Sequence, residues 1–432
     1  MLALSWGVGL GLLAQYMLIL TMIGIRLSVT TIAVPIMGVV LMLIYLSGKG
    51  NKGKGCDLKF NDVNHDRTGM KQAGRIMVFC LLIACIMFQT FFVFWDSFHL
   101  PISYFDAFSS IAMKAKILFY TNSFEHIKDV SNPSYPLQVP LMLTWLSLNL
   151  GYFDEQLIKT FIPLTYLSFL CLQYFFLREW TGKLWSLLGV VLLTGSYMFV
   201  HHASACLRDF TMLYYNCAAI MMILVWDKRK DDSFLILAAL LSGFATFTKL
   251  EGSAYWAIHL LLLCILIFFL RKNNFKSRLG NLLIFLIPSL SIGLLYHLFK
   301  VRLGIPNTER LAIEFSMENL GRIPRIISRI TRGLINYQHW NITWLLCALS
   351  FFISIHKLKS NTVKLILCAL IFYFGMYFML ALTNTVNFNS IAGSCAYDVL
   401  PRVLLHFFPV ATWLIVLLQG QNNNRDRNVQ SG

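Results

Sequence analysis

Residues 76–95 have the sequence IMVFCLLIACIMFQTFFVFW, in which no side chain is charged. A helix of about 20 apolar residues is long enough to cross the hydrocarbon core of a bilayer, so this segment predicts a transmembrane helix. Other segments of similar composition follow along the chain, although several are shorter. Together they predict twelve spans, at residues 3–25, 28–47, 76–95, 159–177, 184–201, 211–226, 233–248, 253–270, 280–299, 341–357, 363–382 and 403–419.

The composition of the whole chain agrees with these spans. Of 432 residues, 57% are hydrophobic and only 13% are charged, whereas soluble domains contain about 25% charged residues. These values argue against a soluble enzyme and against a disordered chain. The ten cysteines lie mostly in apolar segments and form no CxxC pair, so neither a zinc site nor a disulfide framework is predicted. We therefore expect an all-α, polytopic membrane bundle of about twelve spans.

The basic loops predict the orientation of the bundle, because cytoplasmic loops are enriched in Lys and Arg. Residues 48–75 contain seven Lys and Arg and are therefore placed in the cytoplasm. Alternation from there puts four further short basic segments on the same side, at residues 178–183, 227–232, 271–278 and 356–364. The opposite, outer side receives residues 96–158, 202–210, 249–252, 300–340 and 383–402. The net charge of +16 is thus first a topological signal, and no nucleic-acid partner is expected.

The chain has no linker that would separate a soluble domain, and it shows no internal repeat. We divide it into three parts. Residues 1–75 comprise two N-terminal spans and the basic cytoplasmic loop. Residues 76–270 hold the first outer loop, 96–158, and residues 271–432 hold the C-terminal spans with the outer loop 300–340.

The first outer loop is the most informative stretch. Asp106 opens a predicted amphipathic helix whose apolar face runs from Phe105 to Leu118, with Lys114 and Lys116 elsewhere on the helix. An aspartate in a first helical turn can be simply a cap, so its position alone does not assign a function. Residues 137–150 are apolar but too short to span comfortably, which favours a re-entrant or interfacial helix over a spanning one.

Several short motifs occur in an order that resembles bacterial GT-C glycosyltransferases, a superfamily that includes protein O-mannosyltransferases and the aminoarabinose transferases that modify lipid A. The resemblance covers roughly residues 76–270 and the last span. The motifs are DAFSSIAMKAK (106–116), YPLQVPL (135–141), GYFDE (151–155), LRDF (207–210), TKLEG (248–252) and PRVLLHFFP (401–409).

The resemblance implies a reaction and a base. GT-C enzymes transfer a sugar from a polyprenyl-phosphate lipid to an acceptor outside the cytoplasm, and an acidic residue of the first outer loop acts on the acceptor hydroxyl. The match places that role on Asp106. This chain has Ala107 where many relatives have a second acidic residue, which leaves the nature of the base and any metal requirement open. No cofactor is predicted, and a divalent metal is not excluded.

Three cationic residues at predicted outer ends of spans are candidates for binding the donor phosphate: Lys249, Arg402 and Arg208. Charged groups near the membrane are costly unless they are paired or functional. Asp209 follows Arg208 directly and Glu251 lies two residues after Lys249, so structural ion pairs are the alternative interpretation. We list Asp209, Glu251, Lys114 and Lys116 as supporting groups.

The outer loop 300–340 contains four arginines at helical spacing, Arg322, Arg325, Arg329 and Arg332. Isoleucines occupy much of the rest of the same segment. Such a helix can lie on anionic lipid headgroups. Alternatively, it forms a lid whose arginines contact an anionic donor or acceptor, and the sequence leaves both interpretations open.

Taken together, the residues and the resemblance predict a glycosyltransferase of a bacterial inner membrane with its active site on the outer, periplasmic or extracellular, side. The donor would be a polyprenyl-phosphate sugar, and the acceptor a glycolipid, a glycan or a protein. Two alternatives stay open: a polymerase or ligase of lipid-linked glycans with a pyrophosphate-linked donor, and a lipid or solute transporter. Membrane lipids are the other expected partners.

Overall fold

The computed structural model describes residues 2–50, 72–271, 275–305, 317–383 and 399–420. Within these ranges all regular secondary structure is helical, which confirms the predicted all-α class. Nine helices there are long and apolar enough to cross a membrane. They are α1 (Leu2–Met22), α2 (Val29–Gly50), α3 (Gln72–His99), α6 (Phe161–Arg178), α9 (Arg208–Arg229), α11 (Gly252–Ile265, extended by the π-helical turn Leu266–Leu270), α12 (Phe275–Leu303), α17 (Asn361–Thr383) and α18 (Val399–Gly420).

All twelve predicted segments are helical, but the number of spans is not confirmed. The segment 184–201 is broken into α7 (Lys183–Thr194) and α8 (Tyr197–Ser204), which meet at an angle of 71° and together could form one span. At the break, the side chain of Ser196 caps the start of α8 by accepting a hydrogen bond from the Phe199 amide. Two other segments form the shorter apolar helices α10 (Asp232–Thr248) and α16 (Thr343–Ile353).

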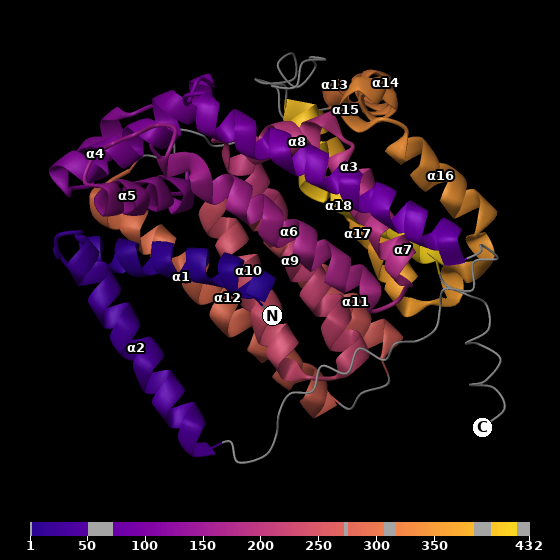
Figure 1. The fold of residues 1–432 in the computed structure, drawn as a ribbon, viewed down its shortest axis with the longest axis horizontal. Helices are drawn as coiled ribbons and strands as arrows, with labels where there is room; N and C mark the ends of the chain where they lie inside the picture. The colour runs from indigo at the N-terminus through magenta and orange to yellow at the C-terminus, as the bar shows by residue number, and fades with distance from the viewer. Residues whose placement is uncertain (1, 51–71, 272–274, 306–316, 384–398, 421–432) are drawn as a thin grey trace.

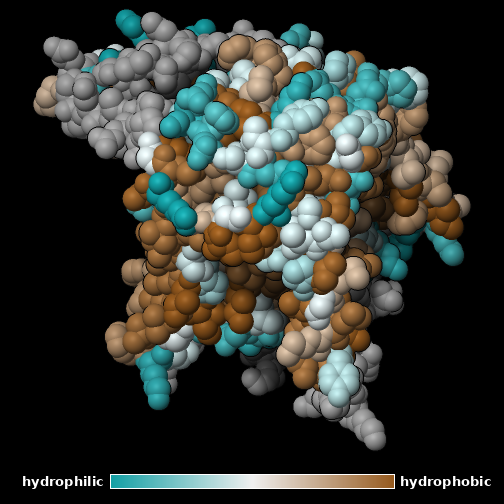
Figure 2. Space-filling view, turned by 90° about the vertical axis from the view of Figure 1, so that its left-hand side faces the viewer, coloured by the Kyte–Doolittle hydropathy of each residue, from teal (hydrophilic) through white to brown (hydrophobic). Residues whose placement is uncertain are grey.

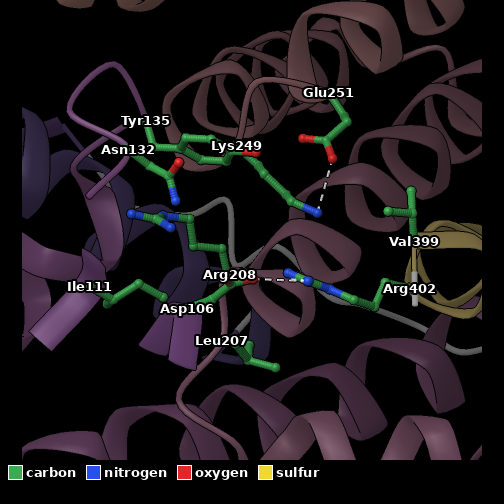
Figure 3. Close-up of a pocket in the computed structure, with 10 residues that line it drawn as sticks. All are labelled: Asp106, Ile111, Asn132, Tyr135, Leu207, Arg208, Lys249, Glu251, Val399 and Arg402. Carbon is green, nitrogen blue, oxygen red and sulfur yellow. Dashed lines mark hydrogen bonds and ion pairs between the residues drawn. The ribbon is translucent and has the colours of Figure 1, made fainter. Parts of the chain in front are cut away.

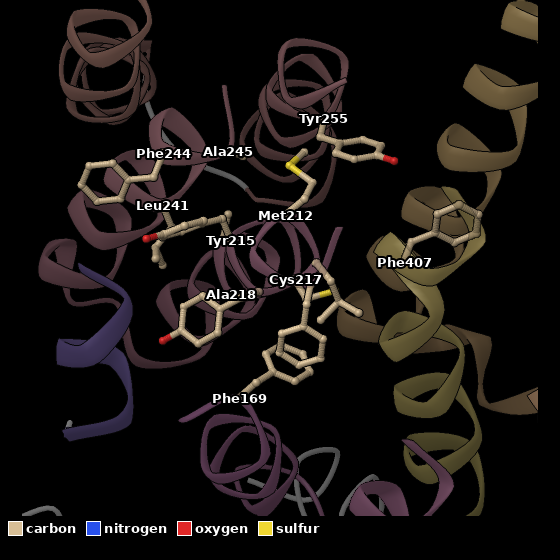
Figure 4. Packing of buried hydrophobic residues seen from close by; sticks show 14 of the residues in the cluster. Phe169, Met212, Tyr215, Cys217, Ala218, Leu241, Phe244, Ala245, Tyr255 and Phe407 are labelled. Atoms are coloured by element: carbon tan, nitrogen blue, oxygen red, sulfur yellow. The ribbon is translucent and has the colours of Figure 1, made fainter. Parts of the chain in front are cut away.

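Helix α9 is the centre of the bundle (Figure 1). Every residue from Arg208 to Trp226 is buried, because α6, α10, α11 and α18 surround the helix. Figure 4 shows Cys217 and Ala218 of this helix in a core that also contains Phe169, Phe244 and Phe407 from the neighbouring helices. A helix enclosed by protein can carry polar side chains at membrane depth, as α9 does at Asn216.

The first helix also packs into this core. Gly7 of α1 lies against the ring of Tyr214, where a Cβ atom would overlap the ring. Tyr214 donates a hydrogen bond to the Ala3 carbonyl at 2.8 Å, and Tyr215 donates one to the Gly7 carbonyl at 2.8 Å. The N-terminal span is thus tied to the central helix. The division of the chain into three parts stays a prediction.

The predicted outer and inner segments separate to opposite ends of the bundle. Helices α4, α5, α8, α14 and α15 lie along its upper end in Figure 1. Figure 2 shows a hydrophobic belt below this more hydrophilic end. At the other end, Glu179 pairs with Lys228 and Arg229, and Asp227 pairs with Arg271 at 2.7 Å, so three predicted cytoplasmic segments contact one another.

The first outer loop differs from the predicted amphipathic helix. It starts with a π-helical segment, Ala107–Ala112, continues as α4 (Met113–Thr121), and reaches α5 (Gln138–Leu150) through a short 3₁₀ turn, Glu125–Asp129. A π turn contains more residues than an α turn and therefore rotates the following side chains. Phe105 and Phe108 of the predicted apolar face are exposed, whereas Ile111, Ala112, Ala115 and Leu118 of the same face are buried. Lys114, which was predicted off this face, is also fully buried.

Helix α5 is too short to cross a membrane. Its 13 residues extend about 20 Å, whereas the hydrocarbon core is about 30 Å thick. It packs against α1 and α4 through most of its residues. Residues 137–150 are therefore a helix held at one end of the bundle.

The arginine-rich segment forms α14 (Ile323–Ile335), between the short helices α13 (Met317–Leu320) and α15 (Tyr337–Trp340). Arg322 is its N-cap residue. Ile326 is its only buried residue among those described, so the helix lies on the surface of the bundle next to α16, α17 and α18.

Candidate functional site

A cavity of about 120 Å³ opens at the N-terminal end of α9. Four of the predicted outer segments meet around it, although they lie far apart in the sequence. Figure 3 shows the lining residues, which are Asp106, Ile111, Asn132, Tyr135, Leu207, Arg208, Lys249, Glu251, Val399 and Arg402. The cavity thus combines the proposed base with all three proposed phosphate ligands.

Asp209 is the buried carboxylate that connects the cationic residues of this site. Its side chain is completely buried in the first turn of α9, where the helix dipole favours a negative charge. One carboxylate oxygen accepts hydrogen bonds from Lys249 Nζ and His406 Nε2, each at 3.0 Å. The other accepts from Arg402 Nε at 3.1 Å and Nη2 at 2.9 Å. A buried carboxylate requires this degree of pairing, because an unpaired charge is very costly away from water.

Lys249 joins this cluster to Glu251. It ends α10 in an extended conformation, and its ammonium group lies 3.0 Å from a carboxylate oxygen of Glu251. Burial lowers the pKa of Lys249, but the charges of Asp209 and Glu251 outweigh burial and hold that pKa above its usual 10.5. Burial likewise raises the pKa of Glu251, and the charge of Lys249 outweighs it, so the pKa of Glu251 lies below its usual 4.5. Both groups are therefore charged at neutral pH.

Asp106 is the most exposed of the three carboxylates at this site. Its side chain is 42% exposed, compared with 21% for Glu251 and 0% for Asp209. Arg402 Nη1 donates to it at 3.0 Å, using the edge of the guanidinium that does not contact Asp209. Arg402 thus fixes the position of Asp106 relative to the buried cluster.

Arg208 differs from the other two cations, because in the described part of the chain it forms no ion pair with a carboxylate. Its Nη2 donates to Ser110 Oγ at 3.2 Å, and its guanidinium lies over the ring of Tyr135, 5.0 Å from the centroid. Its Nε is buried and has no hydrogen-bond partner there. This arrangement leaves donor capacity at the cavity wall for an anion.

Lys114 does not line the cavity but holds one of its walls. Its buried ammonium group donates to the backbone carbonyls of Asn132 at 2.5 Å and Tyr135 at 3.4 Å. Tyr296 from α12 donates to the carbonyl of Ser134 in the same turn at 2.9 Å. Lys114, which the sequence predicted as a supporting group, thus holds the backbone of the turn 132–135.

The other predicted cations lie away from the cavity. Lys116 is exposed, with its ammonium 5.7 Å from the centroid of the Phe153 ring. None of the four arginines that begin at Arg322 is among the residues that line the cavity.

Five residues of the site were not among the candidates predicted from the sequence: Ser110, Asn132, Tyr135, Tyr255 and His406. Three of them were within quoted motifs, since Ser110 lies in DAFSSIAMKAK, Tyr135 begins YPLQVPL, and His406 lies one helical turn after Arg402 in PRVLLHFFP. Positions four residues apart share a helix face, which is the signal that links His406 to Arg402. Asn132 and Tyr255 lie in no quoted motif.

A chain of polar groups continues from Asp209 into the bundle. Because His406 Nε2 faces Asp209, its Nδ1 accepts the hydrogen bond from the Tyr255 hydroxyl at 2.8 Å. Deeper still, Asn216 contacts His259 at 3.0 Å and Tyr373 at 2.6 Å. The spans therefore hold more polar groups than their composition suggested.

A metal requirement was left open by the sequence. Among the residues that the structure describes, no group of three or more His, Cys, Asp or Glu side chains is placed to hold a metal ion.

Comparison with known proteins identifies the fold. No protein-family model matches the chain, and no curated protein is significantly similar to it in sequence. The structure is similar to that of ArnT from Cupriavidus metallidurans in the apo state, with a TM-score of 0.55 over 83% of this chain and 14% sequence identity. The chain therefore shares the fold of ArnT. It spans 62% of the length of ArnT.

An archaeal oligosaccharyltransferase is more distantly similar. AglB from Archaeoglobus fulgidus, solved with an inhibitory peptide and a dolichol-phosphate, gives a TM-score of 0.45 at 10% identity. The matched region covers 77% of this chain and 50% of AglB.

Proposed function

We propose that this protein is a membrane glycosyltransferase that transfers a sugar from a polyprenyl-phosphate donor to a hydroxyl group of a glycolipid, glycan or protein. The observation that carries the proposal is the position of Asp106, an accessible carboxylate held by Arg402 at a cavity that also contains Arg208 and Lys249. The GT-C fold and the multi-pass helical bundle support it. We place the protein in a bacterial inner membrane, with this cavity on the outer side.

The proposed reaction needs one base and a site for an anion. The acceptor oxygen attacks the anomeric carbon, the bond between that carbon and the phosphate oxygen breaks, and Asp106 takes the acceptor proton. Polyprenyl phosphate leaves as an anion, so no general acid is required. Asp209 is unsuited to the role of base, because it is fully buried and both of its oxygens already accept hydrogen bonds.

The cations have different tasks in this proposal. Lys249 and Arg402 are bound to Asp209, Glu251 and Asp106, which orient them and balance their charge. Arg208 has no carboxylate partner among the described residues, and a guanidinium suits a phosphate oxygen. We assign Arg208 as the main phosphate ligand, with Lys249 and Arg402 stabilising the charge that develops on the leaving group.

The test is transfer of radiolabelled sugar from a panel of polyprenyl-phosphate donors into native lipids and glycans, with the purified protein in vesicles. Asp106→Asn should lose transfer and should retain the elution profile and melting temperature of the wild type. Asp154→Asn is a matched control, because it makes the same change in the same outer loop at a residue that does not line the cavity. The control should transfer at the wild-type rate.

The outcomes separate the alternatives. Transfer that survives Asp106→Asn would keep the enzyme class and reject Asp106 as the base, with Glu251 as the next candidate. Transfer from pyrophosphate-linked donors alone would identify a polymerase or ligase instead. Absence of transfer from every donor, with protein that is folded, would reject the proposal in favour of a transporter.

A further inference from the structure

We infer that the donor sugar binds against a wall formed by Asn132, Tyr135 and Glu251, which we name the sugar wall. This inference rests on the proposed function, because it assigns a part of the same cavity. All three residues line that cavity, and in Figure 3 they are drawn above Asp106 and Arg402. The base and the sugar wall therefore belong to different parts of one cavity.

The chemistry of these three side chains suits a carbohydrate better than a phosphate. Tyr135 supplies an aromatic ring that can pack against the C–H groups of a sugar, and Asn132 supplies an amide that can both donate and accept hydrogen bonds. Glu251 is ionised, and a carboxylate repels a phosphate. The phosphate is therefore expected at Arg208, with the sugar ring between it and Glu251.

Glu251 sets the kind of sugar substituent that is recognised. One of its oxygens is paired with Lys249, whereas the other, Oε2, is buried and has no hydrogen-bond partner among the described residues. A buried acceptor without a partner is energetically unfavourable. A hydroxyl or a protonated amine on the sugar would supply the missing donor, so the preferred donor carries such a group at the position that faces Glu251.

The wall is also held in place before any ligand binds. Lys114, whose side chain is fully buried, donates to the carbonyls of Asn132 and Tyr135, and Tyr296 binds the carbonyl of Ser134 between them. Asn132 adopts a left-handed conformation with φ of 54°, which asparagine tolerates better than most residues. Burial of the Lys114 ammonium group costs free energy, and the contacts that it makes fix the backbone of residues 132–135. A backbone that is fixed before the ligand binds favours selective binding.

The test compares two donors with the same polyprenyl phosphate and sugars that differ at one ring substituent, a hydroxyl or amine in one and hydrogen in the other. The measured quantity is the ratio of kcat/KM for the two donors. Glu251→Gln should change this ratio by about tenfold for donors that differ at the position facing Glu251, and Asn132→Gly should change it by about tenfold for donors that differ at a neighbouring ring position. Glycine is chosen at position 132 because it accepts the positive φ.

Arg208→Lys is the matched control, since the phosphate is common to both donors and lysine keeps a cation at the position that covers the Tyr135 ring. It should lower kcat/KM for both by a similar factor and leave the ratio unchanged. The inference is rejected if Glu251→Gln and Asn132→Gly also leave the ratio unchanged while the melting temperatures show folded protein.

A second measurement does not depend on turnover. Binding of bare polyprenyl phosphate and of the sugar-loaded donor is measured by native mass spectrometry for the wild type, Asn132→Gly and Lys114→Met. Both variants should weaken binding of the sugar-loaded donor and leave binding of the bare phosphate lipid unchanged. Equal weakening of both ligands would overturn the sugar wall, whereas binding of neither ligand to the wild type would reject the proposed function itself.

Discussion

Arg402 and Asp209 are linked by two hydrogen bonds from the guanidinium to a single carboxylate oxygen, at 3.1 and 2.9 Å, although 193 residues separate them in the chain. The third nitrogen of the same guanidinium contacts Asp106 at 3.0 Å. One arginine therefore connects the buried cluster to the accessible carboxylate. A substitution of Asp209 should therefore alter the position of Asp106, because Arg402 contacts both carboxylates.

Asp209→Asn should destabilise the protein strongly. The substitution keeps the volume of the side chain but removes the charge that Lys249 and Arg402 share, and both of these cations are largely buried. Removing one partner of a buried ion pair costs about 3–5 kcal/mol, because the remaining charge is left without compensation. Thermal unfolding in detergent measures the loss. Asp129→Asn, at a carboxylate that is 67% exposed, should leave the melting temperature nearly unchanged, and an equal melting temperature for Asp209→Asn would contradict the central role of Asp209.

Tyr255→Phe tests whether the hydrogen bonds from Tyr255 to His406 and from His406 to Asp209 position the buried carboxylate. The change removes the hydroxyl that donates to His406 Nδ1 at 2.8 Å, so the imidazole is no longer fixed with Nε2 toward Asp209. We expect kcat for sugar transfer to fall about tenfold, or about 1.4 kcal/mol, with little change in KM for the donor. Tyr152→Phe is the control, because this tyrosine is exposed. An increase in KM without a fall in kcat would show that Tyr255 acts on binding and not on the position of the cluster.

The pair formed by Lys249 and Glu251 should stabilise the protein across a wide pH range. The pKa of Glu251 is lowered by folding, so its contribution is present above 4.5 and is lost as the pH falls through the lowered value. The pKa of Lys249 is raised, so its contribution is present below 10.5 and is lost as the pH rises through the raised value.

The melting temperature of the wild type minus that of Glu251→Gln is the measurement that checks this pH dependence. It should be constant between 4.5 and 10.5 and shrink on the acid side of that window. A step in the difference near neutral pH would instead indicate that a histidine, such as His406 beside Asp209, controls the stability of the site.

Local patterns were sufficient to predict the helices and the ends at which charges gather. Apolar runs and basic loops are properties of short segments, and they placed Asp106, Arg208, Lys249 and Arg402 on the same side of the membrane. The structure brings all four to one cavity. The predicted span 184–201 is a broken helix in the structure. Hydropathy does not detect such a bend, because the segment stays apolar on both sides of it.

The parts that were missed depend on contacts between distant segments. Lys114 follows the π-helical segment after Asp106 and is fully buried, and no residue of that segment predicts a π turn from the sequence. Lys114 donates to the carbonyls of a turn that begins 18 residues later in the chain. Tyr255 and His406, which form a hydrogen bond, are 151 residues apart. Such pairings are decided by packing, which a single sequence does not display.

The arginines of α14 allow a last prediction that separates the two interpretations of that helix. Arg325 and Arg332 are exposed, and neither lines the cavity. A basic residue at an anionic membrane surface contributes about 1 kcal/mol to binding. If α14 lies on lipid headgroups, sugar transfer by the wild type should be faster in vesicles with anionic lipid than in neutral vesicles. The double variant Arg325→Gln and Arg332→Gln should lose most of this stimulation, with KM for the donor unchanged.

Lys116→Gln with Lys128→Gln is the control, because it removes two exposed cations of the first outer loop, and it should keep that stimulation. A higher KM for the donor in detergent, where no anionic lipid is present, would favour the lid instead, because the arginines would then contact the donor directly.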